Sequence, residues 1–163
     1  MTRIRTSIQR RLPRLKRRRN KEIQAPTRLR SSSLFRFDAS LRIAGIGDFH
    51  EEILLTTGIA PTRVHRKGEP RTALRTKFWD QDMWLLSSPI GDDASLDEHL
   101  EWLWKTIAPH KSYFAGLIAK AAWCDVCLGC LSESAFPIIS THAEALLIAR
   151  ELNVDVSFNF TCV

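Results

Sequence analysis

The sequence has no long hydrophobic run. No stretch approaches the roughly 18 apolar residues that a membrane-spanning helix requires. No apolar run of about seven residues follows the basic start, as a secretory signal would need, so disulfide bonds are not expected among the four cysteines. These absences predict a cytoplasmic protein without a membrane span. The arginine-rich, acid-poor start leaves an organelle transit peptide open as an alternative.

Acidic residues are nearly absent from the first 33 positions. Residues 1–33 hold 12 Lys and Arg against one acid, Glu22, a net charge of +11. Residues 34–163 hold 12 Lys and Arg against 17 acids, a net charge of −5, so the whole-chain value of +6 describes neither part. With few apolar side chains, residues 1–33 cannot offset their ordering entropy, which predicts a disordered extension. A nucleic-acid-binding arm, a membrane-surface contact and a non-essential extension all remain open for it.

The sequence also lacks the common catalytic signatures. It contains no H-E-x-x-H, G-x-S-x-G, P-loop or G-x-G-x-x-G motif, and Gly45-Ile46-Gly47 is too short for the last of these. Its five histidines form no metal-ligand pattern. We therefore predict no catalytic residues, no cofactor and no metal site, and an enzyme whose site is assembled in space from distant residues stays an alternative.

The four cysteines are the one cluster that suggests a metal. Cys124, Cys127 and Cys130 are spaced C-x2-C-x2-C, and Cys162 follows later, which is compatible with zinc or an iron–sulfur cluster. Residues 123–131, however, have the composition of a strand, on which Cys127 would point away from the other two. Structural thiols are therefore favoured, and metal binding by the four cysteines remains open.

Two stretches alternate apolar and polar side chains, as half-buried strands do: residues 35–43 and 154–160. Further strands are expected near 63–66, 83–88 and 123–131, and helices over 49–57, 96–107, 110–121 and 141–152. Capping boxes are expected at Asp48–Glu51 and Ser95–Glu98, with a similar start at Thr141. This order predicts one α+β domain over 34–163, an antiparallel sheet with helices packed on one face in a ferredoxin-like layout.

Basic residues concentrate in the irregular segment 62–77, where Glu69 is the single acid. Such a loop suits an anionic ligand or an acidic partner surface, and pairing of its arginines with acids of the body is the alternative. The candidate binding residues are Arg63, His65, Arg66, Lys67 and Arg71. Trp102 lies off the apolar stripe of the helix over 96–107, so it is a candidate interface anchor, or else cover for an adjoining loop.

Four segments resemble the DUF4279 family of bacterial proteins of unknown function. Residues 58–68 read G-x-x-P-T-x-x-x-x-K-G, and the segments 84–88, 96–103 and 152–158 agree in the same order. The similarity covers about residues 35–160. It implies a compact α+β domain with no established activity and no catalytic residues to assign.

Taken together, the acidic body, the resemblance and the missing motifs predict a non-enzymatic protein-interaction module with an unidentified protein partner. By analogy with other small acidic bacterial domains, immunity and antitoxin-like proteins belong to this class. A nucleic-acid-associated protein, binding through residues 1–33 and the loop 62–77, is the first alternative, and the enzyme is the second.

Overall fold

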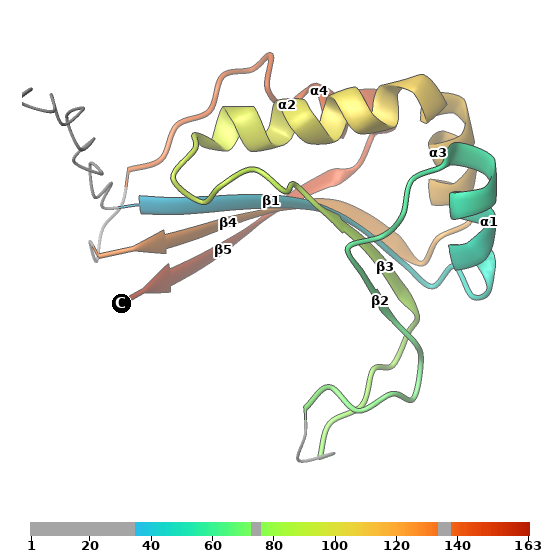
Figure 1. The fold of residues 1–163 in the computed structure, drawn as a ribbon. Coiled ribbons are helices and arrows are strands. Elements are labelled where there is room, and N and C mark those ends of the chain that lie inside the picture. Colours follow the sequence, from blue (N-terminus) through green and yellow to red (C-terminus); the bar gives the residue numbers. More distant parts are fainter. Residues whose placement is uncertain (1–34, 73–75, 134–137) are drawn as a thin grey trace, which may run out of the picture. The chain divides into compact units, whose positions relative to one another are not determined.

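The computed structural model describes residues 35–72, 76–133 and 138–163, which belong to one compact domain (Figure 1). The extension predicted over residues 1–33 lies outside them. The elements, in chain order, are β1 (Phe35–Ala44), α1 (Phe49–Thr57), β2 (Arg63–His65), β3 (Met83–Ser87), α2 (Leu96–Ile107), the 3-10 turn η1 (Ala108–His110), α3 (Lys111–Ile118), β4 (Trp123–Ser132), α4 (Leu147–Leu152) and β5 (Asp155–Cys162). Within the described residues, no helix has the length and apolar character needed to cross a membrane.

The five strands form one mixed sheet in the order β2-β3-β1-β4-β5. β1 is antiparallel to both β3 and β4, and β2 is antiparallel to β3, but β4 and β5 are parallel. The α+β class is therefore confirmed, whereas the expectation of a wholly antiparallel sheet is wrong. The physical reason is the connection through α4, which returns the chain to the end where β4 began, as a βαβ crossover does.

The expectation of a ferredoxin-like layout is also wrong, because of the same parallel pairing of β4 and β5. That layout consists of split βαβ units, in which another strand lies between the two parallel strands. Here β4 and β5 are direct neighbours in the sheet.

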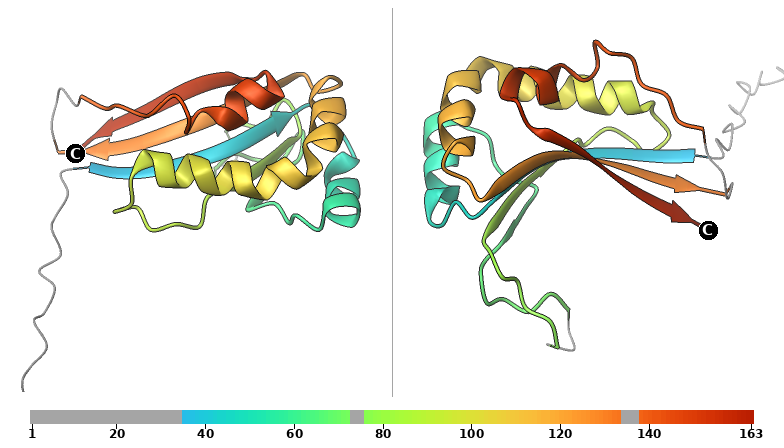
Figure 2. Two further views of the ribbon diagram at one scale, coloured as in Figure 1. Left: turned by 90° about the horizontal axis from the view of Figure 1, so that it is seen from above. Right: turned by 180° about the vertical axis from the view of Figure 1, so that it is seen from behind.

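Helices cover one face of the sheet. Figures 1 and 2 show α2 and α4 lying on this face, with α1 and α3 at one end of it. The alternation in β1 explains why the helices cover this face. The apolar side chains on it are wholly buried toward the helices: Ala39, Leu41 and Ile43. Arg36 and Asp38 point to the other side. We call the side opposite the helices the open face. The prediction that helices pack on one face is confirmed.

Helix α2 supplies much of the core. The capping box expected at its start is present, since the Ser95 hydroxyl accepts from the Glu98 N–H and the Glu98 carboxylate accepts from the Ser95 N–H. Leu100, Leu103 and Ile107 are wholly buried along one stripe of the helix. They belong to one apolar cluster that also contains Trp84 of β3 and Phe114 of α3.

Two predicted N-terminal caps are wrong. α1 spans the expected residues and ends at Gly58, whose φ of 72° is the left-handed value that glycine accommodates. Asp48, however, makes no side-chain hydrogen bond to the helix, so there is no capping box. α4 begins at Leu147, six residues later than predicted, because the Thr141 side chain bonds to Asp97 of α2 and does not cap a helix.

Candidate functional site

Residues 66–72 and 76–82 run side by side as an arm that continues the β2–β3 pair, with one β-bridge between Pro70 and Phe78. Figure 1 shows it extending from the sheet on the side away from α2 and α4. Its two sides are joined by main-chain hydrogen bonds, from Gly68 to the Trp79 carbonyl (2.7 Å), from Trp79 to the Glu69 carbonyl (2.9 Å) and from Arg71 to the Lys77 carbonyl (2.7 Å). Most of the described residues of this segment beyond β2 are turns and bends, as expected, but these three hydrogen bonds join its two sides.

Trp79 is the structural centre of the arm. The His65 imidazole stacks on its indole with ring centroids 4.0 Å apart, and the Arg71 guanidinium lies over the same ring at 4.5 Å. This arrangement adds cation–π attraction to aromatic stacking and ties β2 to the returning side of the arm.

The acids of the arm are all engaged. The Glu69 carboxylate accepts from the Arg66 N–H at 3.0 Å and the Asp82 carboxylate from the Lys67 N–H at 2.9 Å. Asp80 pairs with the Arg71 guanidinium at 2.8 Å. Main-chain donors and Arg71 therefore occupy the three carboxylates.

Four cations of the described arm and its base are available to a partner. Arg63, Arg66, Lys67 and Lys77 are exposed, and none of them takes part in the salt bridges between described residues. Arg71 is paired with Asp80, so for this residue the structure has the pairing that was weighed as the alternative. Burial, and then the charge of Arg63, lowers the pKa of His65, so its ring stacks as a neutral imidazole near pH 7.

Sequence reasoning missed Phe78, Trp79, Asp80 and Asp82. Phe78 is 53% exposed, its carbonyl accepts from the Arg71 guanidinium, and the ring of Trp79 lies against that guanidinium. The signal was present as two adjacent aromatic residues after a turn-rich stretch, which favours a strand returning from a hairpin. The role of the two aspartates depends on pairing across the arm and has no local signature.

Trp102 lies on α2, half-buried, and packs against the apolar core. Its role as an interface anchor stays a prediction.

The cysteines do not converge. The alternation of β4 puts Cys124 and Cys130 on the helix-covered face and Cys127 on the open face, while Cys162 is exposed on β5. Burial raises the pKa of the Cys124 thiol to about 12, so it is protonated at neutral pH and is a poor ligand or nucleophile in that state. In the described part of the chain, no three His, Cys, Asp or Glu side chains are grouped so that they could hold a metal ion.

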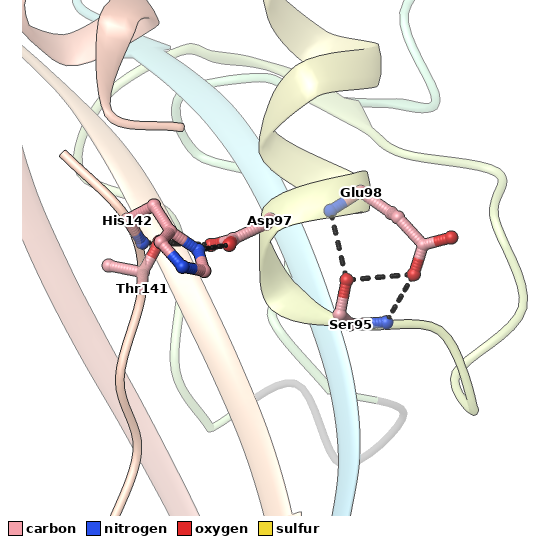
Figure 3. A network of polar contacts seen from close by, with 5 residues as sticks. All are labelled: Ser95, Asp97, Glu98, Thr141 and His142. Carbon is pink, nitrogen blue, oxygen red and sulfur yellow. Dashed lines mark hydrogen bonds and ion pairs between the residues drawn. The ribbon is translucent and has the colours of Figure 1, made fainter. Parts of the chain in front are cut away.

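A second polar cluster joins α2 to the segment before α4 (Figure 3). Nδ1 of His142 and one oxygen of Asp97 are in hydrogen-bond contact, and the other oxygen of Asp97 accepts from the Thr141 hydroxyl. An aspartate that orients a histidine in this way also occurs in hydrolytic sites. Here the His142 side chain is 83% exposed, and no hydrogen bond between described residues joins its other nitrogen to a hydroxyl or thiol nucleophile. The cluster therefore has an orienting acid and a base without the third component.

We predict that the strength of the contact between Asp97 and His142 depends on pH. The hydrogen bond to Asp97 raises the pKa of His142. Burial raises the pKa of Asp97, but the bonds from His142 and Thr141 outweigh it and the net shift is downward. The contact is therefore fully present only between the ordinary pKa of Asp97, 3.8, and that of His142, 6.5. It weakens as the pH rises through the raised pKa of His142 or falls through the lowered pKa of Asp97.

We expect Asp97→Asn to lower the titration midpoint of His142 toward its ordinary value of 6.5, because the carboxylate that stabilises the imidazolium is lost. The midpoint is read from the His142 ring signals in an NMR pH titration. Glu101→Gln, which removes an exposed charge from the same helix, serves as the control and should leave the midpoint in place. Equal midpoints for wild type and Asp97→Asn would contradict the assigned contact.

Comparison with known families shows to which family this chain belongs. Residues 34–162 match the family described as domain of unknown function (DUF4279). The chain belongs to the DUF4279 family. The match confirms the resemblance read from the four segments. No curated protein and no solved structure matches the chain.

The segment that reads G-x-x-P-T-x-x-x-x-K-G in this DUF4279 domain runs from the end of α1 through β2 into the arm. Both of its end glycines have positive φ, 72° at Gly58 and 83° at Gly68, so each needs the conformational freedom of glycine. Between them lie Arg63 and Arg66. The segment therefore fixes where the base of the arm leaves the domain and which cations it presents.

Proposed function

We propose that this DUF4279 domain is a protein-interaction module that binds an acidic surface of a partner protein through its arm. The observation that carries the proposal is the charge arrangement of the arm. Its three carboxylates are occupied internally, whereas Arg63, Arg66 and Lys67 are exposed on a domain whose residues 34–163 are net negative. A positive surface on an acidic body attracts acidic partners and orients them during association.

The aromatic residues favour a protein partner over a solvated loop. Trp and Arg are enriched among the residues that dominate binding energy at protein interfaces, and here they are already held together by stacking. Pre-ordered side chains lose less entropy on binding than mobile ones. The exposed Phe78 adds apolar surface to the arm. Neutralisation of a toxin, as immunity proteins perform it, is one form of this function.

The charge-reversed variant Arg63→Glu/Arg66→Glu/Lys67→Glu tests the proposal. The full chain and the variant are each used as bait in their native host, and proteins retained by wild type but not by the variant are identified by quantitative mass spectrometry. The affinity of each purified pair is then measured by titration calorimetry. We expect the variant to bind at least about tenfold more weakly, with weaker salt dependence, because the steering charges are reversed.

A matched control distinguishes the effect of the arm on binding from the effect of the net charge of the chain. Arg36→Glu/Lys105→Glu/Lys120→Glu makes the same change in net charge outside the arm and should retain the partner. Equal loss of binding in both variants, or equal retention, contradicts a role for the arm.

Nucleic acid is the second candidate, because basic side chains next to exposed aromatic rings also suit single-stranded nucleic acid. Single-stranded RNA and DNA oligonucleotides are titrated into the full chain and into a chain that lacks residues 1–33. Nanomolar binding with a steep salt slope would favour this alternative, and loss on truncation would assign it to the extension.

A further inference from the structure

Strand β5 is the longer of the two edge strands of this sheet. It spans eight residues, pairs with β4 on one side, and on its other side has no partner strand among the described residues. The opposite edge is different, since β2 has only three residues and carries the exposed Arg63. An edge strand presents unpaired N–H and C=O groups to which another strand can bond.

The free edge of β5 lacks the features that normally block such pairing. Natural edges are protected by Lys, Pro, bulges or inward charges. β5 has the sequence DVSFNFTC, with Asp155 at its start as the single charged residue, and it pairs with β4 without a break in register. Nothing in this strand repels a second strand along most of its length.

Two phenylalanines accompany the free edge. Phe158 and Phe160 are 57% and 55% exposed, and their rings stack on each other with centroids 5.9 Å apart. They lie on the helix-covered side of the sheet, where Figure 2 shows the later part of β5 running past α4. Such an uncovered apolar pair is typical of an interaction surface.

The hydrogen-bond pattern fixes which residues face outward. The Val163 N–H donates to the Ser132 carbonyl at 3.1 Å, and in a parallel pair every second residue bonds to the neighbouring strand. Odd-numbered residues of β5 therefore bond to β4. The even-numbered residues, Phe158 and Phe160 among them, direct their main-chain groups to the free edge.

We propose that β5 pairs antiparallel with β5 of a second copy of this chain, about a two-fold axis at Asn159. In this register every residue from 155 to 163 has a partner, and hydrogen-bonded pairs fall on the outward-facing even residues, as the pattern requires. Phe158 of each copy lies beside Phe160 of the other copy, so the four rings form one cluster. The two Asp155 side chains are at opposite ends, about 27 Å apart at 3.4 Å per residue.

Self-pairing is favoured over an unrelated strand because the edge is self-complementary. The register brings aromatic residues together on one face and places Ser157 beside the second copy's Thr161 on the other, and such cross-strand pairs stabilise sheets. No side chains of like charge face each other across the axis. Dimers with this kind of isologous interface are the commonest protein oligomers. The inference is independent of the proposed function of the arm.

The first experiment measures the mass of the full chain by sedimentation equilibrium. Wild type is expected at twice the monomer mass. Phe158→Lys/Phe160→Lys places lysines opposite lysines and is expected to be monomeric. Phe158→Lys/Phe160→Glu places each lysine opposite a glutamate of the other copy and is expected to be a dimer again. Thermal unfolding of the separated species shows whether each variant is folded.

The second experiment tests the axis itself. In a Cys162→Ser background, Asn159→Cys places two thiols in a non-hydrogen-bonded pair with Cα atoms about 4.5 Å apart, within the range of a disulfide. Mild oxidation is expected to give a covalent dimer on a non-reducing gel. Thr161→Cys in the same background is the control and should cross-link far less, since it lies beside Ser157 of the other copy.

Three results would overturn the proposal. The first is a wild type that remains monomeric at about 100 μM, because the affinity between two copies would then be too weak for a specific dimer with this interface. The second is a folded Phe158→Lys/Phe160→Glu variant that stays monomeric while wild type dimerises, because another surface or register is then used. The third is equal cross-linking at positions 159 and 161.

Discussion

Replacing Gly45 by alanine is expected to lower the free energy of unfolding by about 3 kcal/mol, through two effects at one position. Gly45 has a φ of +73°, and a side chain in the left-handed region costs about 1 kcal/mol or more. A Cβ there would also lie 2.6 Å from the Cβ of Ala122, so the backbone must move. The backbone is held on both sides, because Gly45 donates to the Asp82 carbonyl and Ala122 donates to the Ala44 carbonyl.

Gly47→Ala is the matched control for this prediction. Gly47 also has a positive φ, +57°, but an added Cβ would have no atom within 4 Å. The substitution therefore carries only the conformational term and is expected to cost about 1 kcal/mol. Urea unfolding of the two variants beside wild type measures both values. Equal losses would show that the contact with Ala122 contributes nothing.

The local elements were predictable because their signals are local. The alternation of 35–43, the capping box at Ser95 and the glycine at position 58 each depend on residues within a few positions of one another, and the structure confirms the strand, the helix start and the helix end. The parallel pairing of β4 and β5 was not predictable in this way. Alternation reports that one face is buried and does not report the direction of the neighbouring strand.

The sequence allowed the basic residues of the candidate site to be named, but it did not show how their side chains are paired. The cations Arg63, Arg66 and Lys67 could be named from the sequence, because a cluster of one charge is visible there. Which of the basic residues are free depends on acids that approach across the arm, as Asp80 does for Arg71. In the same way, the contact of Asp97 with His142 joins residues 45 positions apart, and no pattern within either segment indicates it.

The second large effect is expected on the open face, at Arg42. Its guanidinium donates to both oxygens of Asp125, at 2.8 and 2.5 Å, and also to the Ser157 hydroxyl at 3.1 Å. The hydrogen bond that Arg42 donates to Asp125 raises the pKa of Arg42 against the opposing effect of burial. The Arg42 guanidinium also lies 5.5 Å from the ring centre of Trp123. One side chain thus links three adjacent strands, β1, β4 and β5.

Arg42→Leu is expected to cost about 3 kcal/mol of unfolding free energy, because it leaves a nearly buried carboxylate without its partner. Asp125 is 7% exposed as a residue, so water replaces the guanidinium poorly. The loss is measured by urea unfolding, since guanidinium chloride would itself screen the ion pair.

The double variant Arg42→Leu/Asp125→Leu distinguishes the penalty of an unpaired charge from the worth of the pair. Removing both charges leaves no buried ion, so the double variant is expected to recover most of the stability lost by Arg42→Leu. If it is no more stable than Arg42→Leu, the arginine acts through packing on Trp123 and its bond to Ser157. In that case the loss should be greatest in β5, where hydrogen exchange would show the strand opening before β1 and β4. The free edge of the sheet would then depend directly on Arg42.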